Sequence, residues 1–195
     1  MATKGQIKAA ASAGREPPPE AQQWDGRLRA TIALLCGALF LDAMDVSSVN
    51  VALPTIGSHL GMPTTSLQWI VSAYVLGYGG FLLLGGRVSD LLGKKQVFLG
   101  ALMVFAVASA VGGLADSGTV LIITRLVKGI AAAFTVPAGL SILTTTFVTD
   151  EDRHRALGAY ASTGAAGFSL GLVIGGLLSE LGWRYVFLVP VPVTA

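Results

Sequence analysis

"GGRVSDLLGKKQVF" (residues 85–98) places one acid and three cations inside an otherwise apolar chain. The chain has 195 residues, of which 53% are hydrophobic and 12% charged, and its mean hydropathy is +0.69. These values exceed those of ordinary soluble domains and indicate a membrane protein. We therefore expect the charged stretch to lie in a short connection between two membrane-spanning segments.

Apolar runs lie on both sides of this stretch, and each is long enough to cross a bilayer, which takes about 20 residues of helix. We predict five spans and the start of a sixth, at about residues 30–53, 66–86, 97–115, 119–143 and 156–179, and from residue 185. Continuous apolar runs without period-two alternation exclude a β-barrel, so the predicted fold class is an all-α membrane bundle. Residues 1–29 have almost no large apolar side chain and are expected to form a disordered tail, not a cleaved leader.

Lysine and arginine are concentrated in every second connection. The tail has five, residues 54–67 none, residues 87–95 three, residues 116–118 none and residues 150–155 two. By the positive-inside rule, we expect the N-terminus and the charged stretch to be cytoplasmic in a multi-pass protein of the plasma membrane. The net charge of +2 is too small to favour nucleic acid as a partner.

The pattern Gly86-x-Val88-Ser89-Asp90-x-x-Gly93-Lys94-Lys95 contains more than a topological anchor needs, because an acid weakens such an anchor. It resembles the signature turn of the major facilitator superfamily, although Leu91 stands where that family usually has a cation. Five further stretches resemble the fourteen-helix drug:proton antiporter branch of this family: LDAMDVSSVNVALPTI, LQWIVSAYVL, RLVKGIAAAFTVPAGLSIL, GAYASTGAAGFSLGLVIGGLL and GWRYVFLVPVPV.

The resemblance implies the N-terminal part of a major facilitator bundle and a gating role for Gly86, Asp90, Gly93, Lys94 and Lys95. It further implies a secondary transporter that exports drug-like or amphipathic small molecules in exchange for protons. The energy source would be a proton gradient, and no cofactor is expected. The simpler interpretation of the charged stretch is a topological anchor alone.

Four charges fall inside predicted spans, where ionisable groups are costly and usually face a cavity or one another. Asp42 and Asp45 share one face of the first span, and Arg125 and Lys128 share one face of the fourth. At 1.5 Å per residue all four lie roughly 9–16 Å below the outer membrane face. The resemblance makes Asp42 an additional acid and Lys128 a replacement for a usual glutamine, so it implies that these two compensate each other and that Asp45 with Arg125 is the proton-coupling pair. The alternative is a permanent ion pair that only holds the two spans together.

Two further groups of residues carry functional hypotheses. A glycine strip on the fifth span would allow a close helix contact, and the resemblance makes it the antiporter hinge: Gly167, Gly171, Gly175 and Gly176. Polar and aromatic residues of the first two spans could line a substrate cavity, although such residues more often serve packing or an interfacial belt: Asn50, Trp69, Tyr74 and Tyr78.

The sequence offers no sign of an enzyme. His59 and His154 lack partners at the spacing of a metal site or a catalytic triad, and no phosphate-binding loop is present. The competing function is a non-transporting helical module, or an uptake carrier of another facilitator branch, inactive alone because truncated. We expect an N-terminal fragment whose partners are the bilayer, a small-molecule substrate, protons and the missing C-terminal spans of the same chain.

Overall fold

The computed structural model of the protein describes residues 25–191, so most of the predicted tail lies outside the described residues. Over this range the chain forms helices and turns without a strand, and five helices are long and apolar enough to cross a membrane. The helices are α2 (Gly26–Leu60), α3 (Thr64–Leu92), α4 (Lys94–Gly113), α5 (Gly118–Thr146), α6 (Asp150–Leu181) and the short α7 (Arg184–Leu188).

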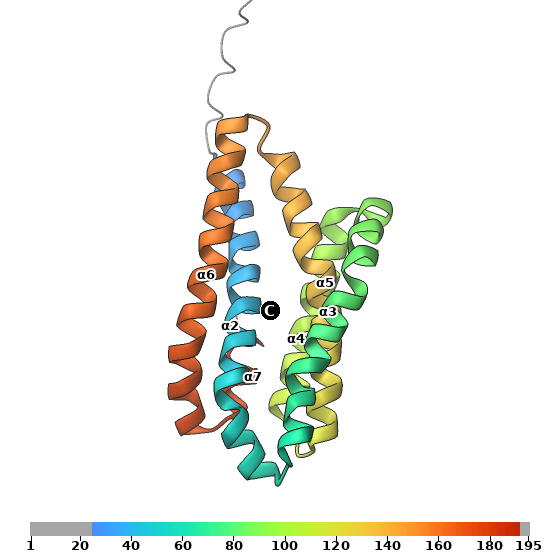
Figure 1. Cartoon of the computed structure of the whole chain (residues 1–195). Coiled ribbons are helices and arrows are strands. Elements are labelled where there is room, and N and C mark those ends of the chain that lie inside the picture. The colour runs from blue at the N-terminus through green and yellow to red at the C-terminus, as the bar shows by residue number, and fades with distance from the viewer. Residues whose placement is uncertain (1–24, 192–195) are drawn as a thin grey trace, which may run out of the picture.

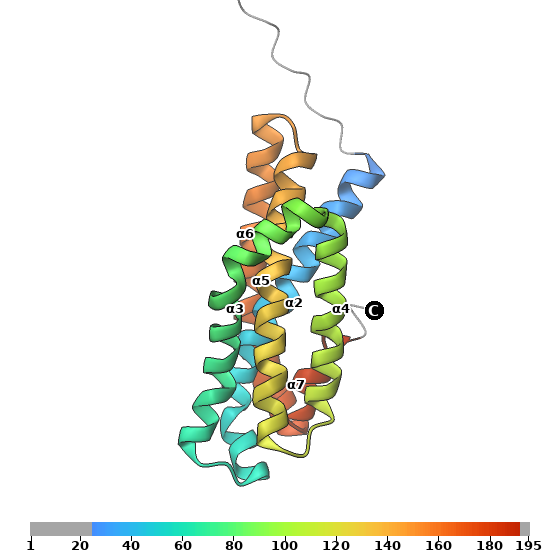
Figure 2. The same cartoon turned by 90° about the vertical axis from the view of Figure 1, so that its right-hand side faces the viewer.

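The five long helices run alternately up and down, as Figure 1 shows. Helix α2 packs along α6, and α5 packs along both α3 and α4 (Figures 1 and 2). The start of α2, the α3–α4 turn and the α5–α6 turn all lie at one end of the bundle, which we name the N-terminal end. The α2–α3 and α4–α5 turns lie at the opposite end.

The helices extend beyond the apolar runs from which the spans were predicted. Helix α2 begins at Gly26 because the Asp25 carboxylate accepts from the Leu28 N–H at 2.9 Å, so the predicted disorder is wrong for residues 26–29. The same helix passes Pro54 and ends only at Gly61, whose φ of 61° lies in the left-handed region that favours glycine. Hydropathy finds the apolar part of a helix, whereas caps decide where the helix ends.

The charged stretch is more helical than predicted. Helix α3 continues to Leu92, and α4 starts at Lys94, so Gly93 alone separates them. Its φ of 97° breaks the helix without the steric penalty that a Cβ would cause. Gly86 and Asp90, which the sequence placed in a turn, therefore lie within the last two turns of α3.

Two apolar clusters lie one beyond the other along the bundle. The cluster towards the N-terminal end includes Leu35, Phe98 and Leu143, and the other includes Ile56 and Leu121. On α2 and on α5, the residues between these clusters include the buried charges that sequence analysis singled out. The apolar clusters therefore bracket a polar layer.

Candidate functional site

A carboxylate and two cations meet in the polar layer. Asp45 lies in the middle of α2, while Arg125 and Lys128 lie one turn apart on α5. Arg125 Nη1 donates to Asp45 Oδ2 at 2.6 Å, and Lys128 Nζ donates to Asp45 Oδ1. All three side chains are at most 1% exposed. We name them the charge cluster; with each member ionised, it carries one net positive charge.

Further contacts fix both cations of the charge cluster. Arg125 Nε donates to the carbonyl oxygen of Ile70 at 3.2 Å, and the guanidinium lies 4.4 Å from the centroid of the Tyr74 ring. The Lys128 ammonium lies 4.5 Å from the centroid of the Phe105 ring. Aromatic faces attract cations, so these rings partly replace the hydration that burial removes.

Glycines bring α3 close enough to α5 for these contacts. A Cβ on Gly129 would overlap the backbone of Tyr74, and a Cβ on Gly77 would overlap the carbonyl oxygen of Leu126. The side chains of Arg125 and Tyr74 therefore meet because the two helix backbones are nearly in contact.

Asp42 is bonded to a tyrosine and not to the lysine that the sequence suggested. The Tyr74 hydroxyl donates to Asp42 Oδ1 at 2.6 Å, whereas Lys128 donates to Asp45. The predicted pairing of Asp42 with Lys128 is therefore wrong, and Asp45 has both Arg125 and Lys128 as partners. The resemblance suggested one acid for each cation, whereas helical rise alone places Lys128 closer in depth to Asp45 than to Asp42.

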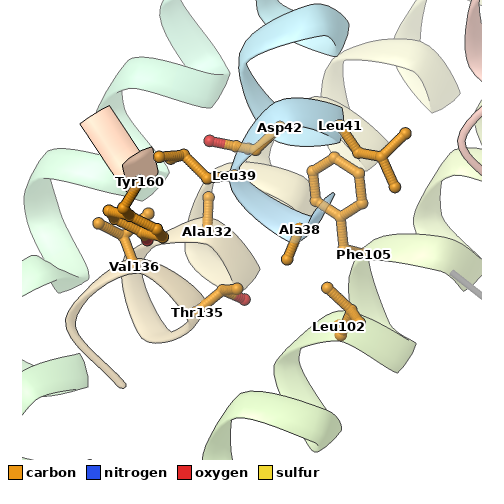
Figure 3. Close-up of a pocket in the computed structure, with 10 residues that line it drawn as sticks. All are labelled: Ala38, Leu39, Leu41, Asp42, Leu102, Phe105, Ala132, Thr135, Val136 and Tyr160. Carbon is orange, nitrogen blue, oxygen red and sulfur yellow. The ribbon is translucent and has the colours of Figure 1, made fainter. Parts of the chain in front are cut away.

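The half-buried Asp42 side chain faces a narrow pocket. Figure 3 shows it between the side chains of Tyr160 and Phe105. The pocket lies among four helices and is lined by Ala38, Leu39, Leu41, Asp42, Leu102, Phe105, Ala132, Thr135, Val136 and Tyr160. Its volume is about 10 Å³, close to the space that one water molecule needs. Asp42 therefore lines this pocket, whereas the fully buried Asp45 does not.

Sequence reasoning did not select Tyr160 or Phe105. Tyr160 precedes Gly167 by two helical turns, so it lies on the same face of α6 as the glycine strip. This helical periodicity could have shown from the sequence that Tyr160 faces α2. Phe105 lies in an apolar run of similar residues, and nothing in the sequence distinguishes it.

The residues predicted to form a gating turn lie at the junction of α3 and α4. Asp90 is exposed in the last turn of α3, and Lys94 and Lys95 begin α4. The Asp90 carboxylate has no hydrogen bond or ion pair within the described part of the chain, so the expected contact with a helix start or a cation is absent there. Gly93 provides the break between the helices, and Gly86 lies inside α3.

The glycine strip of α6 faces α2. A Cβ on Gly167, Gly171 or Gly175 would overlap the α2 backbone or a side chain on it, and the Ser48 hydroxyl donates to the carbonyl oxygen of Gly171 at 2.8 Å. Gly176 lies beside the strip, where an added Cβ would make only ordinary contact. The strip therefore places α2 and α6 in close backbone contact.

The four residues predicted to line a substrate cavity differ in their exposure and in their contacts. Asn50 is exposed, and its amide donates to the carbonyl oxygen of Val46 at 2.8 Å. Trp69 is 54% exposed. Tyr74 and Tyr78 stack with ring centroids 6.3 Å apart. The narrow pocket beside Asp42 is lined by none of these four.

A metal ion has no evident ligand set here. The charge cluster consists of one acid and two cations, which repel a metal ion, and residues 25–191 contain no group of three or more His, Cys, Asp or Glu side chains that could hold one.

Comparison with known proteins finds a matching family model and several relatives. A model of the Major Facilitator Superfamily matches residues 35–195. The chain is 38% identical over 176 residues to the puromycin resistance protein pur8 of Streptomyces alboniger, covering 90% of this chain and 34% of that protein. It is 42% identical over 163 residues to the cephamycin export protein CmcT of Amycolatopsis lactamdurans, covering 83% and 34%. It is 36% identical over 165 residues to the methylenomycin A resistance protein of Bacillus subtilis (strain 168), covering 84% and 35%. The chain thus spans about a third of the length of the curated relatives it matches.

Proposed function

Because the chain belongs to the Major Facilitator Superfamily, we propose that it forms part of a secondary transporter that exports drug-like or amphipathic small molecules in exchange for protons. The protein is a multi-pass membrane protein, and its five long apolar helices are those of the N-terminal part of a facilitator bundle. The activity is that of a whole carrier, in which these helices form about a third of the chain length of the relatives.

The charge cluster is the observation that carries the proposal. A buried acid with two cations has little use in a lipid-facing packing module, because apolar side chains of similar size would stabilise such a module at least as well. Ionisable groups inside membrane bundles mark ion and substrate pathways. A proton-driven carrier needs such groups, since its charge must change as its conformation changes.

The direction of transport is proposed from the relatives. Those named above carry the words resistance or export in their names, which favours efflux over uptake by this chain. Their names also cite different molecules, so we propose only the broad class of drug-like small molecules and no single substrate. We propose the plasma membrane as the site of action and the proton gradient as the energy source.

The cytoplasmic orientation of the N-terminus is also a proposal. The basic connections all lie at the N-terminal end of the bundle, in the α3–α4 and α5–α6 turns beside the start of α2. At the opposite end, Arg184 forms an ion pair with Asp116. This distribution supports a cytoplasmic N-terminal end by the positive-inside rule.

The whole protein can be tested in inverted membrane vesicles with an imposed pH gradient. We expect uptake of labelled puromycin into vesicles that are acidic inside, and its loss when an ionophore collapses the gradient. Asp45→Asn should abolish this uptake, and Glu180→Gln, which changes an exposed acid of α6 in the same way, should not. Gradient-independent uptake, or equal uptake by vesicles without the protein, would refute the proposal for this substrate and this energy source.

A further inference from the structure

The two carboxyl groups of α2 have different surroundings. Both oxygens of Asp45 accept from cationic donors, and the side chain is fully buried. Asp42 accepts at Oδ1 from the Tyr74 hydroxyl, and no other donor among the described residues contacts its carboxyl. Asp42 is also half-buried and faces the narrow pocket (Figure 3).

These surroundings make proton binding easier at one acid than at the other. A proton on Asp45 must displace Arg125 or Lys128 from a carboxylate oxygen, and it leaves a buried cation without its partner, which is unfavourable. A proton on Asp42 Oδ2 displaces neither cation. We propose that Asp42, and not Asp45, takes up and releases the coupled proton, an inference that rests on the proposed proton-coupled function.

The narrow pocket provides space beside Asp42 for the water molecule that would carry this proton. It lies towards the N-terminal end from Asp45, because Asp42 precedes Asp45 by nearly one turn of α2. Its lining residues include Thr135 and Tyr160, which carry hydroxyl groups, and its volume suits a single water molecule. Proton uptake is then a simple transfer: a hydronium ion in the pocket gives its proton to Asp42 Oδ2, one O–H bond forms there, and a neutral water molecule remains.

Charged and titratable groups surround Asp42 from several helices. Helix α2 itself contributes Asp45, and α4 contributes only apolar side chains to the pocket. The groups within electrostatic range on the other helices are Tyr74 and Tyr78 of α3, Arg125 and Lys128 of α5, and Tyr160 of α6. Together with Asp42, the charge cluster is neutral when all four groups are ionised, and proton uptake at Asp42 gives the layer one net positive charge.

Tyr74 connects the proton site to the charge cluster. Its hydroxyl donates to Asp42, and its ring lies under the Arg125 guanidinium. A hydrogen bond to a carboxylate is stronger than one to a neutral carboxyl group, so proton uptake weakens the contact between α2 and α3. Tyr74 is therefore a positioning residue through which the charge of Asp42 affects how α2 and α3 are held together.

Infrared difference spectroscopy of the chain in lipid vesicles tests the site without any transport. The carbonyl stretch of a protonated buried acid should appear as the pH falls, and Asp42→Asn should remove it while Asp45→Asn and Glu180→Gln leave it. Asp42→Glu, which keeps a carboxyl group there, should restore the band at a shifted frequency. A band that persists in Asp42→Asn, or one that disappears only in Asp45→Asn, would overturn the proposal.

Two further measurements separate this inference from the proposed function. Tyr74→Phe, which keeps the ring under Arg125, should move the midpoint of the Asp42 band without removing it, and an unchanged midpoint would reject the link through Tyr74.

In the whole protein, Asp42→Asn should stop puromycin uptake driven by the pH gradient but keep exchange of labelled for unlabelled puromycin at equal pH. Gradient-driven uptake by Asp42→Asn would overturn the inference while leaving the proposed function intact. Absence of gradient-driven uptake in the unmodified protein would instead reject the proposed function for puromycin, and the spectra alone would then decide whether Asp42 binds the proton.

Discussion

Lys128 should be energetically coupled to Asp45 and not to Asp42. In the structure the Lys128 ammonium donates to Asp45, whereas Asp42 is bonded to the Tyr74 hydroxyl. Removing one partner of a buried ion pair typically costs about 3–5 kcal/mol. Lys128→Gln should cost less than this, because Asp45 keeps Arg125 at 2.6 Å. Asp45→Asn should cost more than Lys128→Gln, since it leaves two buried cations without a carboxylate.

The coupling itself follows from a double-mutant cycle. Groups in direct contact within an ion-pair network show coupling energies of about 0.5–3 kcal/mol. For Asp45 and Lys128 we expect at least about 1 kcal/mol, because both side chains are fully buried. For Asp42 and Lys128 we expect a smaller coupling energy than for Asp45 and Lys128, because no hydrogen bond joins Asp42 to Lys128.

Reversible unfolding in mixed micelles, followed by circular dichroism, measures these free energies of unfolding. Each cycle needs the two single variants and the double variant, and Glu180→Gln controls for loss of an exposed acid. Strong coupling of Lys128 to Asp42 together with weak coupling to Asp45 would show that the arrangement of the charge cluster is wrong. A layer with one acid for each cation would give that result.

The other predictions concern packing, topology and the charged stretch. Gly129→Ala should lower the free energy of unfolding by about 1–3 kcal/mol, because the new Cβ overlaps the α3 backbone. Gly158→Ala places its Cβ in open space and should not lower this free energy. The same unfolding assay compares the two variants. In a background without the native cysteine, a membrane-impermeant thiol reagent added outside cells should label Gly61→Cys but not Lys94→Cys, and the reverse pattern would reject the proposed orientation. Asp90→Asn in the whole protein should reduce puromycin export steeply at normal membrane abundance, and full export with this change would leave the charged stretch with only an anchoring role.

Hydropathy located the long helices because a span must be apolar over its whole lipid-facing length. It could not locate their ends, since Asp25 and Gly61 act through local hydrogen bonding and backbone conformation. For the same reason, the continuation of α3 to Leu92 was not expected. Polar ends of helices that project from an apolar layer leave little trace in a hydropathy pattern.

The polar layer was predictable, but its bonding was not. Helical rise alone placed Asp45 and Lys128 at similar depth, and the structure brings them together. Rise along an axis does not include the reach of a lysine side chain or the rotation of each helix. The bond from Tyr74 to Asp42 depends on the close approach of α3 and α5, which two separate glycines permit.

The ion pairs of Asp45 have a consequence for biosynthesis. Arg125 and Lys128 follow Asp45 by 80 and 83 residues in the chain. At a synthesis rate of about 5–20 residues per second, α2 exists for about 4–16 s before the first cation has been added to the nascent chain. During that interval the acid is without its partners, so α2 is expected to remain beside the insertion machinery or in contact with water. Arrival of α5 would then release both helices into the lipid together, and nascent chains that end before residue 125 should hold α2 less firmly in the membrane than chains that include α5.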